Sequence, residues 1–227
     1  MNLFNTILNW SEVWALLIPL AIYLLYRPTD NSSQILGWYL FVAIILNGLS
    51  TTSFVFNESM PAFLKNNNIF YNTHSIARVI FFSWFIQKIT PKQFSFINKI
   101  LLPGYLIFAV VNFIFFENIL FFSSRLFAAE SVVLLFLCIA YFLRSIQDET
   151  VVNWTSHPSF LVCTGIVIYE AITFFIFLFI LPLADRDPEF GLLSLKIYKM
   201  TFVLLCTLIA IAFYRSKQIE LKGKKQV

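Results

Sequence analysis

The chain has 227 residues, of which 59% are hydrophobic and only 12% are charged, and its formal net charge is +4. Soluble globular domains carry roughly 25% charged residues, so this composition argues against an ordinary soluble enzyme or binding domain. Apolar runs of about 20 residues, the length that crosses the hydrocarbon core of a bilayer, occupy most of the chain and indicate a membrane protein.

Seven apolar runs follow one another along the chain, and each is predicted to form a transmembrane helix. The connections between them are short, so consecutive helices are expected to pack as antiparallel neighbours. The predicted fold class is therefore all-α, a seven-helix transmembrane domain over residues 1–214 with a basic cytoplasmic tail over residues 215–227. The predicted spans are 10–26, 34–56, 69–87, 99–116, 123–143, 158–183 and 192–214.

The distribution of basic residues predicts how the chain is oriented, because Lys and Arg are enriched in cytoplasmic loops. Of the 16 Lys and Arg residues, ten fall on the side of the C-terminal tail, five fall on the other side, and Arg78 lies within a span. This asymmetry predicts the N-terminus outside and the C-terminus inside. An acidic connection at residues 184–191 then lies outside.

The third apolar run differs from the others because it contains His74 and Arg78, four residues apart and on one helix face. A guanidinium at the middle of a membrane costs roughly 2.5–3.5 kcal/mol on insertion scales, so it is expected to face the bundle interior and to have an anionic partner. Glu130 and Glu170 are the carboxylates at suitable depth. Glu170 is the first choice, because its depth matches that of Arg78 best.

With the predicted orientation, the polar residues within the spans fall in the outer half of the bundle, above inner halves made of Phe, Leu and Ile. This shared level predicts a ligand-binding pocket that opens outward and suits a small anionic or zwitterionic ligand or a lipid headgroup. Two alternatives stay open: the charges neutralise one another and set helix register, or they form a proton or ion path. The candidate residues are Asn47, His74, Arg78, Asn112, Glu130, Glu170 and Lys199.

Catalytic and metal-binding patterns are absent from the sequence. There is no HExxH, no GxSxG and no phosphate-binding glycine loop. The two histidines, His74 and His157, fall on opposite sides, and the three cysteines lie inside apolar runs without a CxxC. Lys199 lies too far out in its span for a retinal lysine. We therefore expect no enzymatic activity, no cofactor and no metal, and the short tail without interleaved aromatics indicates no nucleic-acid binding.

The segment 152–214 carries a resemblance to a known group of proteins. Pro158, Phe160, Gly165, Ile168 and Tyr169 match the Pro-Phe entry and the Gly and Ile-Tyr positions of small multi-spanning proteins of Bacteroidota, whereas Leu161 and Glu170 depart from that pattern. These proteins resemble the seven-helix membrane parts, or companions, of sensor histidine kinases. The resemblance implies a bacterial cytoplasmic membrane protein that signals through a membrane partner such as a histidine kinase.

Two functions are therefore predicted from the sequence. The first is a non-enzymatic membrane sensor whose outward-facing polar pocket biases helix packing and is read by a partner. The second is a small transporter or channel gated by an Arg–Glu pair. The inner halves of the spans offer no polar exit path, which favours the sensor.

Overall fold

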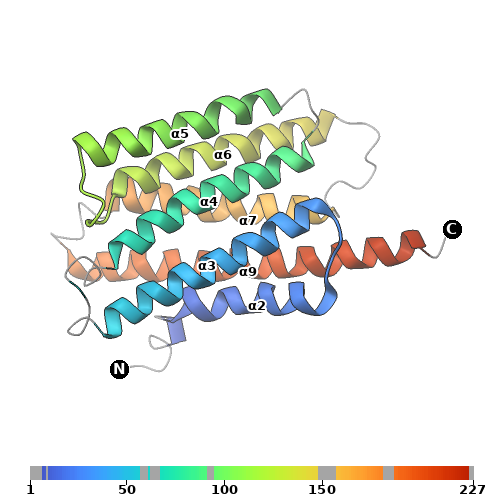
Figure 1. Ribbon diagram of the computed structural model, residues 1–227, viewed down its shortest axis with the longest axis horizontal. Helices are drawn as coiled ribbons and strands as arrows, with labels where there is room; N and C mark the ends of the chain where they lie inside the picture. Colours follow the sequence, from blue (N-terminus) through green and yellow to red (C-terminus); the bar gives the residue numbers. More distant parts are fainter. Residues whose placement is uncertain are drawn as a thin grey trace.

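The protein is a bundle of long α-helices (Figure 1). The structure is a computed structural model that describes residues 7–8, 10–56, 61, 67–90, 95–147, 157–180 and 187–224. The α-helices in these residues are α2 (Ser11–Tyr26), α3 (Asn31–Val55), α4 (Asn68–Ile89), α5 (Ser95–Phe115), α6 (Ser124–Gln147), α7 (Pro158–Phe175) and α9 (Pro188–Lys224). A π-helical segment, η4 (Ile176–Ile180), continues α7.

Each predicted span coincides with one of these helices, which confirms the all-α fold class. The main difference is α9, which has 37 residues and continues to Lys224 instead of ending near residue 214. The segment RSKQIELKGK contains no proline and consists mostly of residues with good helix propensity, so nothing in it stops the helix. Lys217 and Glu220 also form an ion pair of 3.1 Å across one turn. The basic segment predicted as a tail is therefore largely helical, and it projects beyond the other helices (Figure 1).

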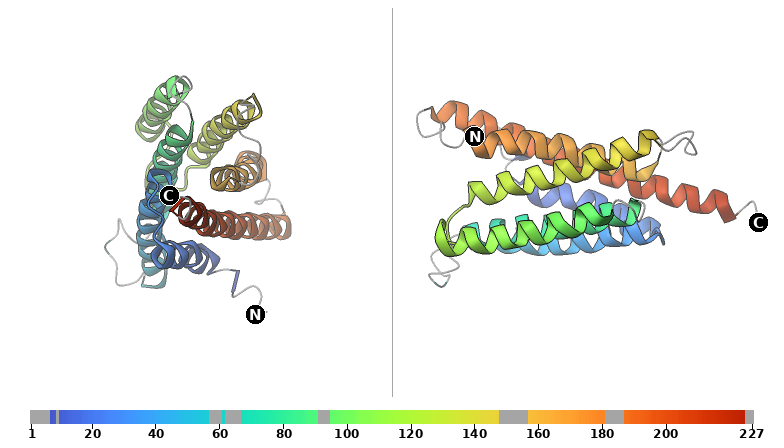
Figure 2. Two further views of the ribbon diagram at one scale, coloured as in Figure 1. Left: turned by 90° about the vertical axis from the view of Figure 1, so that its right-hand side faces the viewer. Right: turned by 90° about the horizontal axis from the view of Figure 1, so that it is seen from above.

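The helices run up and down in sequence order, so consecutive helices are antiparallel (Figure 1). Six of them close into a ring in which each packs on its neighbours, in the order α2, α3, α4, α6, α7, α9 and back to α2 (Figure 2). α5 lies outside this ring against α4 and α6. Only 22% of the apolar stretch of α5 is buried, against 50% of the corresponding stretches of α6, α7 and α9.

The surface of the bundle is strongly apolar. Large side chains such as Leu25, Ile114 and Phe115 are 73%, 67% and 73% exposed. Five helices, α3, α5, α6, α7 with η4, and α9, are long and apolar enough to cross a membrane. α2 is apolar but has only 16 residues, and α4 carries His74, Arg78 and Lys88. This combination of exposed apolar surface and long apolar helices is that of an integral membrane protein.

Local sequence signals explain where two helices begin at the same end of the bundle. Asp30 is the N-cap of α3, and its carboxylate accepts a hydrogen bond of 2.8 Å from the backbone N–H of Ser33. His157 is the N-cap of α7 and precedes Pro158 at the first helical position, where a missing N–H has no consequence.

Candidate functional site

Arg78 lies at the centre of the ring and is 1% exposed, which makes it the largest fully buried side chain of the described residues. α4 presents it inward because Arg78, Phe82 and Phe85 recur at helical spacing and form the buried face of that helix. His74 and Ser75 lie one turn earlier on the same face. The expectation that the guanidinium faces the bundle interior is confirmed.

The carboxylate that pairs with Arg78 is Glu130 on α6. Arg78 Nε lies 2.8 Å from Glu130 Oε1, and the two side chains are 1% and 0% exposed. The N–H does not point along this contact, so it is an ion pair and not an aligned hydrogen bond. The expectation that Glu170 is the first partner is wrong. Depth along the membrane does not specify lateral position, and α4 packs extensively on α6 but little on α7.

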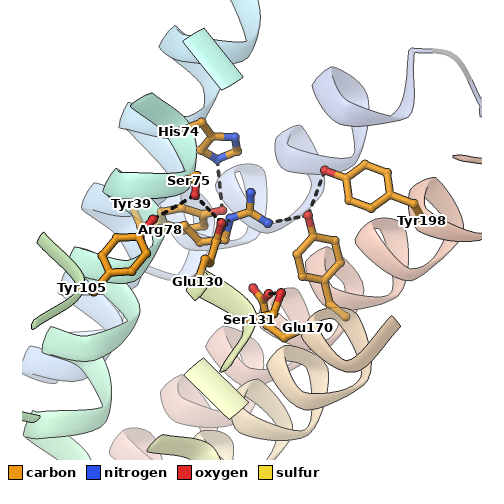
Figure 3. A network of polar contacts seen from close by, with 10 residues as sticks. Tyr39, His74, Ser75, Arg78, Tyr105, Glu130, Ser131, Glu170 and Tyr198 are labelled. Carbon is orange, nitrogen blue, oxygen red and sulfur yellow. Dashed lines mark hydrogen bonds and ion pairs between the residues drawn. The ribbon is translucent and has the colours of Figure 1, made fainter. Parts of the chain in front are cut away.

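Glu170 joins the same group of side chains by another route (Figure 3). Its Oε2 accepts a hydrogen bond of 2.7 Å from Ser131 Oγ, the residue that follows Glu130 on α6. The residue that precedes it on α7, Tyr169, accepts a hydrogen bond from Arg78 Nη1. The five side chains therefore form a closed circuit across α4, α6 and α7, which we call the Arg78 circuit: Arg78, Glu130, Ser131, Glu170 and Tyr169.

Further hydroxyls extend the Arg78 circuit to α5 and α9 (Figure 3). Ser75 Oγ donates to Glu130 Oε2 at 2.5 Å and lies 3.1 Å from the hydroxyl of Tyr105 on α5. Tyr169 donates to the hydroxyl of Tyr198 on α9 at 2.9 Å. The circuit thus connects five helices through buried polar atoms.

His74 forms a separate contact beside the circuit. Its Nε2 lies 3.3 Å from the hydroxyl of Tyr39 on α3, and the two rings are stacked with their centroids 6.0 Å apart. The Tyr39 ring in turn packs on Phe82 at 4.7 Å. Through this contact α3 is also tied to the polar centre of the bundle.

The Arg78 circuit contains one cation and two carboxyl groups, all without solvent exposure. Glu130 provides the counter-charge for Arg78, and Glu170 Oε1 has no hydrogen-bond partner among the described residues. Thr173, one turn further along α7, is also fully buried with an unpartnered Oγ1. Buried polar atoms without partners are rare in native proteins, so Glu170 Oε1 and Thr173 Oγ1 are the candidate atoms for a further hydrogen-bond partner in this region.

The remaining candidate residues lie outside the circuit. Asn112 on α5 donates to Glu117 and Ser123 near the connection between α5 and α6, at 3.1 and 3.0 Å. Asn47 on α3 is 4% exposed, and its Nδ2 has no partner within the described residues. Lys199 is half-buried on α9, where the preceding residue, Tyr198, is the one that joins the network.

The predicted outward opening of this cluster stays a prediction. Arg78, Glu130 and Glu170 are each at most 1% exposed in this structure. Residues 57–60, 62–66 and 181–186, which include the first three residues of the acidic connection at 184–191, lie outside the described residues at that end.

An apolar layer separates the Arg78 circuit from the opposite end of the ring. Phe82 follows Arg78 on the buried face of α4, Ile166 precedes Glu170 by one turn on α7, and Ile209 lies on α9. Their exposures are 0%, 0% and 1%. This agrees with the apolar inner halves that the sequence predicts, and it closes the interior on that side.

The tyrosines and serines of the network are absent from the sequence-based candidates: Tyr39, Ser75, Tyr105, Ser131, Tyr169 and Tyr198. One signal could have found two of them. Glu130-Ser131 and Tyr169-Glu170 are adjacent polar pairs within otherwise apolar spans. Neighbours on a helix point about 100° apart, so such a pair can reach two different helices.

The fold and the network define a class: an all-α bundle of membrane-protein character with a buried, charged centre and no metal-ligand cluster of three or more His, Cys, Asp or Glu in the residues described. No family model, curated protein or solved structure matches the chain.

Proposed function

We propose that this protein is a seven-span protein of the bacterial cytoplasmic membrane, with the N-terminus outside, that acts as a non-enzymatic sensor and signals through a partner. The observation that supports this function most directly is the Arg78 circuit. It joins α4, α6 and α7 at the centre of the bundle and contains two carboxyl groups for one cation.

The physical reason lies in what buried charges do. A buried ion pair contributes little net stability, because desolvation offsets its attraction, but removing one member is strongly destabilising. A change in the charge or occupancy of Glu170 therefore alters the hydrogen bond that Ser131 donates, next to Glu130, the counter-charge of Arg78. Such a change alters the relative stability of different packings of α4, α6 and α7. Switching proteins depend on local changes of this kind.

The arrangement of the helices supports the proposed topology. The seven α-helices of the described residues run alternately up and down, so the start of α2 and the end of α9 lie at opposite ends of the bundle (Figure 1). α2 is short and α4 is partly polar, but each packs between two apolar helices of the ring, α2 between α9 and α3 and α4 between α3 and α6. Seven crossings with opposite termini match the ten-to-five distribution of basic residues.

A transporter gated by the Arg78–Glu130 pair is the second candidate function. The central position of this pair favours it, since charged residues within membranes often mark ion or substrate pathways. The apolar layer of Phe82, Ile166 and Ile209 favours the sensor, because a transported polar solute would have to cross this layer of buried apolar side chains.

The two functions are distinguished by one pair of measurements on the same protein. Spin labels at the exposed positions Leu143 on α6 and Leu221 on α9 report the distance between the helix ends in lipid nanodiscs, in a background without the three native cysteines. A sensor predicts two distance populations whose ratio shifts in Glu170→Gln, together with no solute or proton flux in proteoliposomes. Flux that Arg78→Met abolishes would identify the transporter. A single distance that Glu170→Gln leaves unchanged would refute the sensor.

The partner is expected to be a membrane signalling protein, with a histidine kinase as the kind that the sequence resemblance implies. Native co-purification from mild detergent tests this expectation. The projecting end of α9, which carries exposed Ile219 and Leu221, is the segment whose removal should release the partner.

A further inference from the structure

A pocket of about 300 Å³ lies at the end of the ring opposite the predicted outward opening. It is bordered by the starts of α3 and α7, by the end of α4 and by the C-terminal part of α9. Its floor is apolar and is formed by Leu36, Phe85, Val162 and Phe213. Its rim is polar and includes Asp30, His157 and Glu220. The sequence-based candidates include none of these residues.

The two carboxylates on the rim differ in their partners. Glu220 is paired with Lys217, whose Nζ lies 3.1 Å from Glu220 Oε2. Asp30 accepts hydrogen bonds from the backbone N–H of Ser33 at 2.8 Å, from Ser32 Oγ at 2.6 Å and from Ser216 Oγ. These donors are neutral, and no Lys or Arg in the described part of the chain forms an ion pair with Asp30. Asp30 therefore provides a negative charge at the rim without a cationic partner.

We propose that this pocket binds a small protonated amine with an apolar body, which places its ammonium group at Asp30 and its body on Leu36, Phe85, Val162 and Phe213. The volume is at the lower end of the range for ligand pockets, which corresponds to a molecule with about one ring. The proposal is independent of the sensor function, because it depends on the pocket alone.

The protonation state of Asp30 supports this choice of ligand. Burial alone would raise the pKa of Asp30, but the hydrogen bonds from Ser216, Ser32 and Ser33 outweigh it and hold the pKa below its usual value. The carboxylate is thus ionised throughout the neutral range, in which aliphatic amines are protonated. The amine therefore keeps its charge partner at physiological pH.

Isothermal calorimetry on the full chain in nanodiscs of zwitterionic lipid tests the proposal, with empty nanodiscs as the blank for partitioning. The probes are 2-phenylethylamine, 2-phenylethanol and 3-phenylpropionate, which share a ring and differ in charge. We expect saturable binding of the amine and at least tenfold weaker binding of the other two. Asp30→Asn should weaken amine binding at least tenfold, because asparagine caps a helix as well as aspartate but carries no charge. Glu189→Gln, which removes a charge in the first turn of α9, far from the pocket, should change it less than threefold.

A second variant covers the case in which Asp30→Asn does not fold. Ser32→Phe narrows the pocket from its rim and removes the hydrogen bond from Ser32 Oγ to Asp30, but it keeps the Asp30 side chain and its cap to Ser33. It should weaken binding of 2-phenylethylamine at least fivefold. The proposal is overturned if the amine shows no saturable binding, if the propionate binds as well as the amine, or if either variant binds the amine like the wild type.

Discussion

Arg78 Nε and Glu130 Oε1 lie 2.8 Å apart between α4 and α6, and neither side chain is more than 1% exposed. The other side of the same guanidinium donates to the hydroxyl of Tyr169 on α7. One side chain therefore connects α4 to both α6 and α7. A substitution at Arg78, Glu130 or Tyr169 is therefore expected to alter the contacts of the other two residues.

A double-mutant cycle tests the ion pair. Arg78→Met and Glu130→Gln should each lower stability by about 3–5 kcal/mol, because each leaves an uncompensated buried group. The double variant should be more stable than the sum of the single changes predicts. Thermal unfolding in detergent measures this difference. Arg78→Met combined with Glu170→Gln is the control and should recover less, and equal recovery in both cycles would contradict the assignment of Glu130.

The second prediction concerns the hydrogen bond that Arg78 donates to the hydroxyl of Tyr169. Tyr169→Phe removes an acceptor from the charged Arg78 and should lower stability by about 1.5–3 kcal/mol, the range for hydrogen bonds to charged groups. Tyr198→Phe is the matched control. It removes only the neutral partner of Tyr169 at 2.9 Å and should lower stability by about 0.5–1.5 kcal/mol. The reverse order of the two melting temperatures would show that Arg78 does not depend on Tyr169.

Gly37 on α3 allows a close approach of α2. A Cβ atom at this position would lie 2.7 Å from both Cε atoms of the Tyr23 ring, which itself packs on Phe213 at 5.2 Å. Gly37→Ala should therefore lower the melting temperature, because the Tyr23 ring must shift. Gly48→Ala on the same helix meets no atom within 4 Å and should raise stability by about 0.5–1 kcal/mol. Equal shifts for the two variants would contradict the close packing of α2 on α3.

Asp30 makes stability depend on acid pH. Its pKa is held below the usual value by the hydrogen bonds from Ser216, Ser32 and Ser33, so the unfolded chain binds the proton more readily than the folded one. The stabilisation is therefore complete above about pH 4, near the unfolded pKa, and is lost as the pH falls through the folded value. Melting temperatures between pH 7 and pH 3 should fall more steeply for the wild type than for Asp30→Asn. Ser216→Ala should reduce that difference, and parallel curves for all three would refute the effect.

The proposed topology is tested by reporter fusions. A reporter that is active only in the cytoplasm should be active when fused after Val227 and silent within residues 184–191. The physical reason is the excess of Lys and Arg on the side of the tail. The opposite pattern would reverse the orientation, and activity at both sites would exclude an α9 that crosses the membrane.

The sequence alone predicted most of the fold. Each helix was predicted to within a few residues at most ends, because an apolar run of membrane length leaves the backbone few alternatives to a helix. The exception was the end of α9, where the apolar pattern stops near Tyr214 but helix propensity continues to Lys224. The inward position of Arg78 was also predictable, since a guanidinium facing lipid is too costly.

The lateral order of the helices was decided only by the tertiary structure. Glu130 and Glu170 lie at similar depths, and only the packing of α4 on α6 makes Glu130 the partner of Arg78. The same holds for Asp30 and Ser216, which are 186 residues apart and meet because α9 returns to the start of α3. Hydropathy records depth along the membrane normal and carries no information about neighbours within its plane. The polar centre and the pocket around Asp30 both depend on those neighbours.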